Sequence, residues 1–185
     1  MIKETLTEAR QKMDKAIEVT QEEFGAVRTG RANPALFANL TVEYYGSPTP
    51  MQQLASFQVP EARTVVITPY DRSAMGDIEN ALRNSDLGAN PANDGNVIRV
   101  VLPQLTEERR KEYVKLVKTK AEDGKVSIRN IRRKAKEALE RMSKDGDVGE
   151  DEADRGIKEL DEITKSRADE VDRLLDAKEA ELLEV

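Results

Sequence analysis

The sequence predicts an α+β fold in which an elongated three-helix bundle carries a small inserted β/α/β domain. Apolar residues recur every three or four positions along three long segments, which is the pattern of amphipathic helices. All seven prolines lie between Pro34 and Pro103, so one central stretch differs in character from both flanks. Aromatic residues make up only 4% of the 185 residues, which favours thin helical packing over a thick globular core.

The first long segment predicts a helix that runs from the beginning of the chain to the neighbourhood of Gly30. No glycine precedes Gly25, and no proline precedes Pro34. Gly30 could adopt the left-handed conformation that closes a helix, and Pro34 cannot continue one. The apolar positions of this helix are Ile2, Leu6, Ala9, Met13, Ala16, Thr20, Phe24 and Val27.

Residues 31–104 predict a small domain of short strands around one helix. Strands are expected at residues 40–45, 53–59, 64–68 and 97–102, which are rich in β-branched and aromatic residues. Residues 46–50 and 93–95 have the composition of turns. Between the strands, Ser73 could cap a helix that carries Ile78, Ala81 and Leu82.

Two further long helices are predicted after Pro103. Thr106 is a suitable N-cap for the first of them, with Glu107 and Glu108 at the positive end of the helix dipole. Residues 145–149, with the sequence DGDVG, interrupt the helical pattern before the last helix begins. The apolar positions of the two helices are Val114, Val117, Ala121, Gly124, Ile128, Ile131, Ala135, Ala138 and Met142, and then Ile157, Leu160, Thr164, Ala168, Val171, Leu175 and Leu182.

The three apolar stripes can be buried only against one another, and this defines the domains. Residues 1–30 and 105–185 form the predicted bundle, and residues 31–104 form the inserted domain. Two short connections join the parts, so a hinge is expected at both. Its predicted residues are Gly30, Ala32, Leu102, Pro103 and Gln104.

The composition excludes several kinds of chemistry. The chain has no Cys and no His, which removes thiolate nucleophiles, imidazole bases and ordinary zinc sites. It contains neither the G-x-x-x-x-G-K-[ST] nor the G-x-G-x-x-G nucleotide pattern, and residues 145–156 lack the glycine and the glutamate that a calcium loop needs at its sixth and twelfth positions. We therefore expect no catalytic residue, no metal site and no cofactor, and we do not expect an enzyme.

The hydropathy of the chain indicates a soluble protein. No stretch approaches the roughly 20 consecutive apolar residues that a membrane span requires. The first residues lack the apolar region of a secretion signal. A cytoplasmic protein without a membrane partner is expected.

The net charge of −6 conceals a strong asymmetry. Residues 105–143 hold 13 basic and 7 acidic residues, whereas residues 150–185 hold 6 basic and 14 acidic residues. Cations on the predicted second helix share one stripe, with Arg133 at its edge. The stripe consists of Lys118, Lys125, Arg129, Arg132 and Lys136.

Three interpretations of this stripe stay open. It can bind phosphates, because a guanidinium group pairs with phosphate through two parallel hydrogen bonds. It can be a solvated face, or it can pair internally with the acidic third helix. Arg28 and Arg31, which flank Thr29 and Gly30, could likewise bind free carbonyls at the end of the first helix or contact a phosphate.

Six motifs, taken in order along the chain, resemble the ribosome recycling factor family of bacteria. They are RTGRA at 28–32, VEYYG at 42–46, PTP at 48–50, DLG at 86–88 followed by NP at 90–91, LTEERRK at 105–111 and VSIRNIRR at 126–133. The resemblance extends over essentially the whole chain. It implies a two-domain, L-shaped protein of about the size of a transfer RNA, with the bundle as the long arm.

The resemblance also implies a function. Members of the family bind the ribosome that remains on messenger RNA after termination, and elongation factor G then uses GTP to split it into subunits. Initiation factor three afterwards keeps the small subunit from rejoining. The family's contacts with ribosomal RNA of the large subunit correspond to Arg28, Arg31, Arg129, Arg132 and Arg133, while Lys125 and Lys136 are added from the stripe alone.

Two other function classes remain as alternatives. A helical adaptor could use the same basic stripe to bind an acidic protein, and an enzyme of unknown type is the third class. The resemblance favours a factor that works as a monomer on ribosomal RNA.

Overall fold

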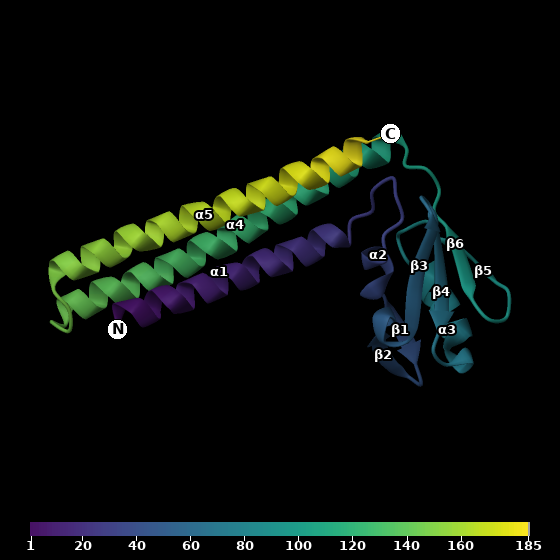
Figure 1. Cartoon of the computed structure of the whole chain (residues 1–185), viewed down its shortest axis with the longest axis horizontal. Coiled ribbons are helices and arrows are strands. Elements are labelled where there is room, and N and C mark those ends of the chain that lie inside the picture. The colour runs from purple at the N-terminus through teal and green to yellow at the C-terminus, as the bar shows by residue number, and fades with distance from the viewer. Residues whose placement is uncertain (185) are drawn as a thin grey trace. The chain divides into compact units, whose positions relative to one another are not determined.

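The computed structural model describes residues 1–184 and divides the chain into two compact units. Met1–Phe24 and Lys115–Ala180 form the first, here called the bundle unit. Gly25–Val114 and the described residues from Glu181 onward form the second, here called the sheet unit. Long helices together with a β-sheet domain confirm the predicted α+β class (Figure 1).

Three long helices build the bundle: α1 (Ile2–Gly25), α4 (Glu107–Lys144) and α5 (Glu150–Leu183). They lie side by side in Figure 1. Each helix buries its apolar stripe against the other two helices, because their stripes are the apolar surfaces available to cover it. The buried positions within the unit include Leu6, Ala9, Met13 and Ile17 of α1, Val117, Ala121, Ile128 and Leu139 of α4, and Ala153, Leu160, Ile163 and Val171 of α5.

The stripe of α4 differs from its prediction toward the C-terminal end. Leu139 is fully buried although it was not assigned to the stripe, whereas Ile131, Ala138 and Met142 are only half-buried. The predicted spacing averages 3.5 residues per turn, and a straight helix has 3.6, so the buried face drifts by about 20° in every seven residues. Ile131 is therefore a flank of the core and not its centre.

Two glycines allow the helices to approach closely. A Cβ atom at Gly124 of α4 would clash with Oγ1 of Thr20 on α1 and would lie 3.5 Å from the Cβ of Thr20. A Cβ atom at Gly156 of α5 would lie 3.0 Å from Cγ2 of Ile2. The missing side chains thus set how near α1 can come to both of its partners.

The helix ends confirm some predicted signals and correct others. Thr106 caps α4, since its hydroxyl accepts a hydrogen bond from the backbone N–H of Arg109 at 3.1 Å. Gly146, with φ +79°, turns the chain between α4 and α5. The first helix ends at Gly25, earlier than predicted, and Gly30 does not have a positive φ. Glycine is a poor helix former, but it does not by itself end a helix, since α4 and α5 continue through Gly124 and Gly156.

The sheet unit contains two antiparallel sheets. The hairpin of β1 (Thr41–Tyr44) and β2 (Ser47–Pro50) forms one. The other has the order β3-β4-β6-β5, from β3 (Ala55–Glu61), β4 (Thr64–Pro69), β6 (Ile98–Val101) and β5 (Asn90–Asn93). The helices are α2 (Ala35–Ala38) and α3 (Met75–Arg83), with two 3₁₀ turns at Met51–Gln53 and Arg72–Ala74.

The core of the sheet unit brings both sheets and both helices together. Its fully buried members include Phe37, Val42, Met51, Val65, Ile67, Ile78, Leu82, Ile98, Val100 and Leu102. Predicted strands correspond to β1, β3, β4 and β6, with ends shifted by at most two residues. Ser73 is not the helix cap that was predicted, because the side chain of Asp71 caps the 3₁₀ turn by accepting from the N–H of Ser73 at 2.9 Å.

The sequence analysis missed two strands, β2 and β5, which both contain proline. Proline cannot donate a backbone hydrogen bond, so within sheets it is found mainly on edge strands and at strand ends. β5 is an edge of the four-stranded sheet, and β2 pairs with β1 alone. Edge position explains why these residues can be strands despite a turn-like composition.

The unit boundaries differ from the predicted domains 1–30 with 105–185 and 31–104. Residues 25–30, 105–114 and 181–184 belong with the sheet unit. Two predicted hinge residues are also anchored within that unit: the N–H of Ala32 donates to the carbonyl of Ala62 at 2.6 Å, and that of Leu102 donates to Arg63 at 2.8 Å. Leu102 is fully buried, and Gly30, Pro103 and Gln104 also lie within the sheet unit, so the hinge as a whole stays a prediction.

None of the helices within residues 1–184 is long and apolar enough to cross a membrane.

Replacing Gly124 with alanine is expected to destabilise the protein by about 1–3 kcal/mol, although alanine usually favours a helix over glycine by about 1 kcal/mol. The clash with Thr20 overrides the helix preference. Urea denaturation followed by far-UV circular dichroism measures the change. In the Thr20→Ala background, the same glycine substitution should cost little.

Gly76 provides the matched control, because a Cβ atom there would meet nothing within 4 Å. Gly76→Ala should be neutral or stabilising. Equal denaturation midpoints for the two glycine variants would show that α1 and α4 do not meet as closely as described.

Candidate nucleic-acid interface

The basic stripe lies on α4 beside α5, and this position decides what each cation meets. Within the bundle unit, Lys118 pairs with Glu179 at 3.7 Å and Arg132 pairs with Asp161 at 2.6 Å. Lys125 forms an ion pair with Asp172. Internal pairing with the acidic third helix, one of the three interpretations left open by the sequence, therefore applies to these three cations.

Two other members of the stripe pair within α4. Nη2 of Arg129 lies 2.6 Å from Oε1 of Glu122, and Nζ of Lys136 lies 3.8 Å from Oε1 of Glu140. More than half of the Arg129 side chain remains exposed. Exposed ion pairs contribute only about 0.2–1 kcal/mol to stability. A phosphate can therefore displace the carboxylate from the cation, or bind the same cation beside it.

Arg133 and Arg132 keep guanidinium donors that are open to a ligand. Arg133 is exposed and makes no ion pair with any residue in the range 1–184. Arg132 contacts Asp161 through Nε, and its two terminal nitrogens make no hydrogen bond in the described part of the chain. The terminal edge of a guanidinium is a geometry that binds phosphate through two hydrogen bonds.

Arg28 lies elsewhere and is buried, with 4% of its surface exposed. Its guanidinium donates to the carbonyls of Thr29 and Leu87, each at 3.4 Å, and to that of Pro103. Burial lowers the pKa of Arg28, and the like charge of Arg63 adds to this effect. This burial leaves little of Arg28 open to the predicted phosphate. Arg28 does bind carbonyls, but those of Thr29, Leu87 and Pro103 lie outside α1 and are not the helix-end carbonyls of the alternative interpretation.

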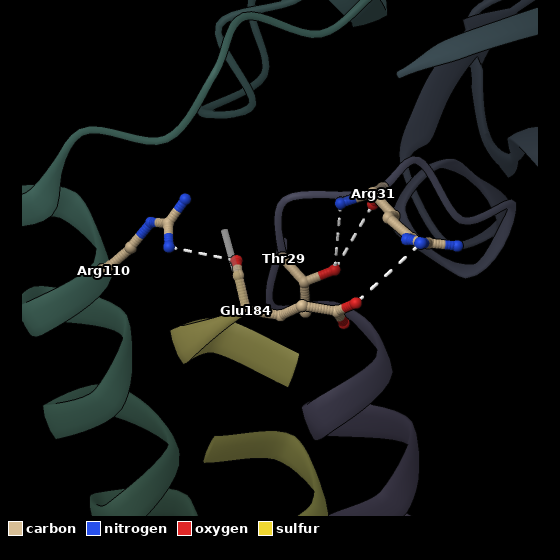
Figure 2. A network of polar contacts seen from close by, with 4 residues as sticks. All are labelled: Thr29, Arg31, Arg110 and Glu184. Carbon is tan, nitrogen blue, oxygen red and sulfur yellow. Dashed lines mark hydrogen bonds and ion pairs between the residues drawn. The ribbon is translucent and has the colours of Figure 1, made fainter. Parts of the chain in front are cut away.

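Arg31 belongs to a separate polar network in the sheet unit (Figure 2). Its Nη2 lies 3.8 Å from Oε1 of Glu184, and Nη1 of Arg110 donates to the backbone carbonyl of Glu184 at 3.0 Å. The hydroxyl of Thr29 lies 3.4 Å from both N and O of Arg31. The Arg31 side chain is 76% exposed, so it remains accessible to an anion.

The structure thus separates the predicted RNA contacts into groups. Arg129, Arg132 and Arg133, with Lys125 and Lys136, share one face of α4, whereas Arg28 is internal and Arg31 lies in the sheet unit. Sequence reasoning missed Arg110 and Glu184, which are 74 residues apart and carry no local signal of their pairing. Residues 1–184 hold no group of three or more Asp and Glu side chains placed to bind a metal ion.

Comparison with known proteins identifies similar sequences. A family model described as "Ribosome recycling factor" matches residues 20–183. The ribosome-recycling factor of Renibacterium salmoninarum is 69% identical over 185 residues, and that of Streptomyces coelicolor is 60% identical, each covering 100% of both chains.

Two solved structures are similar over the whole chain. A solution structure of a ribosome recycling factor has a TM-score of 0.77 and 41% identity, and covers 100% of this chain and 98% of that one. The second has a TM-score of 0.70 and 43% identity, with 100% of both chains covered. That structure shows models for the T. thermophilus ribosome recycling factor and the E. coli elongation factor G bound to the E. coli post-termination complex.

Replacing Arg28 with methionine is expected to cost about 1–3 kcal/mol, because the carbonyls that it binds would remain buried without a donor. The matched change Arg133→Met should stay within about 0.5 kcal/mol, since that side chain is exposed. Urea denaturation followed by far-UV circular dichroism measures both variants, and tyrosine fluorescence reports in addition on the sheet unit, which holds Arg28. The four tyrosines all lie in the sheet unit and no tryptophan obscures them.

Equal and small midpoint shifts for the two variants would contradict a structural role for Arg28.

Proposed function

The chain belongs to the ribosome recycling factor family, and from this premise we propose that it binds the post-termination ribosome and, with elongation factor G and GTP, splits it into subunits. The observation that carries the proposal is the open basic face of α4. Arg129, Arg132 and Arg133 stand there on one helix, at the positions of the family motif. Ribosomal RNA of the large subunit is the proposed ligand.

Electrostatics supports an RNA ligand despite the overall charge of −6. Phosphate contacts by Lys and Arg supply most of the sequence-independent affinity for nucleic acids. Salt screens charges farther apart than about 8–10 Å, so the local cations of α4 matter more to a bound phosphate than distant acids do. The face can thus bind RNA although the whole molecule is acidic.

The chain's own contribution to splitting would be binding and stiffness. The 38 residues of α4 extend for about 57 Å at a rise of about 1.5 Å per residue. A closely packed core resists gradual deformation, so the bundle can transmit a displacement along its length. The sequence has no phosphate-binding loop for GTP, so we assign the free energy source to elongation factor G.

The remaining parts of the proposal concern partners and setting. The sheet unit would follow elongation factor G by motion at the two predicted connections, around Gly30 and around Pro103, while the bundle stays on the RNA. Initiation factor three would act afterwards on the separated small subunit, without a contact to this chain. We propose that the protein works as a monomer in the cytoplasm and not as an enzyme.

A helical adaptor that binds an acidic protein is the second candidate, because the α4 stripe would also attract carboxylates. Nuclease treatment of the partner separates the two. Only an RNA ligand would be lost by this treatment.

Replacing Arg133 with glutamate should weaken binding to purified large ribosomal subunits at least tenfold, or about 1.4 kcal/mol. Loss of one phosphate contact should also reduce the slope of log K against log salt by about 0.7–0.9. Equilibrium binding across a salt series measures both quantities. Arg129→Glu should behave in the same way.

The control is Arg173→Glu, which makes the same charge change at an exposed arginine of α5 that has no ion pair within residues 1–184. Its affinity should stay within about twofold of wild type. Equal losses in the Arg133 and Arg173 variants would mean that net charge, and not the face of α4, governs binding.

Ribosome splitting followed by light scattering tests the proposed activity directly. The wild-type chain should lower the scattering of post-termination ribosomes only when elongation factor G and GTP are both present. Arg133→Glu should reduce the rate at limiting protein and regain it at high protein, because its defect lies in binding. Splitting without the GTPase would contradict the assignment of the energy source.

A further inference from the structure

Three ion pairs line the junction between α4 and α5, with an even spacing on α4 only. Lys118, Lys125 and Arg132 are seven residues apart on α4, and their partners Glu179, Asp172 and Asp161 follow in the reverse order on α5. Seven residues correspond to about 10.5 Å along a helix. The acids therefore run beside the basic stripe for several turns.

In two of the three pairs the carboxylate is more exposed than the cation that it binds, whereas in the third Lys118 is 61% exposed and Glu179 is 24% exposed. The Arg132 side chain is 34% exposed and that of Asp161 is 49% exposed. The Lys125 side chain is 23% exposed and that of Asp172 is 48% exposed. A phosphate that approaches either cation from solvent must also approach the carboxylate beside it.

These pairs have a small effect on stability and a larger one on an anionic ligand. Half-exposed ion pairs stabilise a fold only weakly. When RNA approaches, each carboxylate repels the incoming phosphate. It also neutralises part of the charge of its cation, so that cation releases fewer counterions from the RNA when the two bind. Asp161 and Asp172 thus lie beside the cationic groups that the phosphates of a ligand would contact.

We infer that Asp161 and Asp172 limit the affinity of the α4 face for RNA by competing with phosphates for Arg132 and Lys125. This inference rests on the proposed function, because it requires that the α4 face binds RNA. The acids act as affinity-determining residues: they keep the complex weak enough to dissociate. Differences in affinity between related complexes arise mostly from the dissociation rate. A factor that must leave the ribosome after each round needs rapid dissociation.

The test is the affinity of Asp161→Asn and Asp172→Asn for purified large ribosomal subunits. Asparagine keeps the shape and one acceptor oxygen and removes the charge. Each variant should bind about two- to fivefold more tightly than wild type, the range that corresponds to an exposed ion pair. The two sites are 11 residues apart, so the double variant should show approximately the product of the two factors.

Glu159→Gln is the matched control. Glu159 precedes Asp161 by two residues on α5, and its carboxylate pairs with Arg10 of α1 at 2.9 Å. This variant also loses one negative charge and one ion pair between helices, but it frees no cation of the α4 stripe. Its affinity and its salt slope should match those of wild type, whereas Asp161→Asn should steepen the slope by up to about 0.7–0.9.

A second comparison ties the effect to Arg132. In the Arg132→Gln background, Asp161→Asn should no longer tighten binding, because the cation that it frees is absent. Tighter binding in both backgrounds would overturn the inference and indicate general repulsion. Weaker binding of Asp161→Asn in the wild-type background would also overturn it, since Asp161 would then hold Arg132 in place for the phosphate.

The experiment separates failure of this inference from failure of the proposed function. If Arg132→Gln and Arg133→Glu weaken binding while Asp161→Asn and Glu159→Gln are alike, only the role of the acids is wrong. If all of these variants bind as wild type does, the α4 face does not bind RNA, and both proposals fall.

Discussion

The burial of the apolar stripe of α4 against α1 and α5 is the constraint on which the rest of the bundle unit depends. Val117, Ile128 and Leu139 are fully buried, and Gly124 lets Thr20 of α1 come close. A helix with a buried stripe cannot rotate about its axis without exposing it. The stripe therefore fixes the direction of every polar side chain on α4.

The distribution of charge follows from this fixed rotation. Lys118, Lys125 and Arg132 reach the acidic residues of α5, while Arg133 points to solvent. One helix thus carries cations that are already paired and a cation that is available. Affinity for a polyanion then depends on α5 as much as on α4, because the acids and the phosphates compete for the same groups.

The sequence predicted the helices and the alternating strands well, because both depend on local periodicity. Thr106 as a cap and residues 145–149 as a turn follow from short-range backbone chemistry. The edge strands β2 and β5 were missed although β3, also an edge, was predicted, since prolines give β2 and β5 a turn-like composition that is tolerated only where one strand edge has no partner. The end of α1 was predicted near Gly30 but lies at Gly25, because either glycine gives the same local signal for the end of a helix.

By itself, the sequence determined the fold class, the family, and the presence of a basic stripe beside an acidic helix, because each is a pattern of residue types along the chain. Only the tertiary structure decided which cations are free. Arg28 binds carbonyls 59 and 75 residues away, and Arg132 binds an acid 29 residues away. Such partners are brought together by packing of distant segments, which no local pattern encodes. The same packing turned Arg28, which the sequence had grouped with the RNA contacts, into a buried donor to backbone carbonyls.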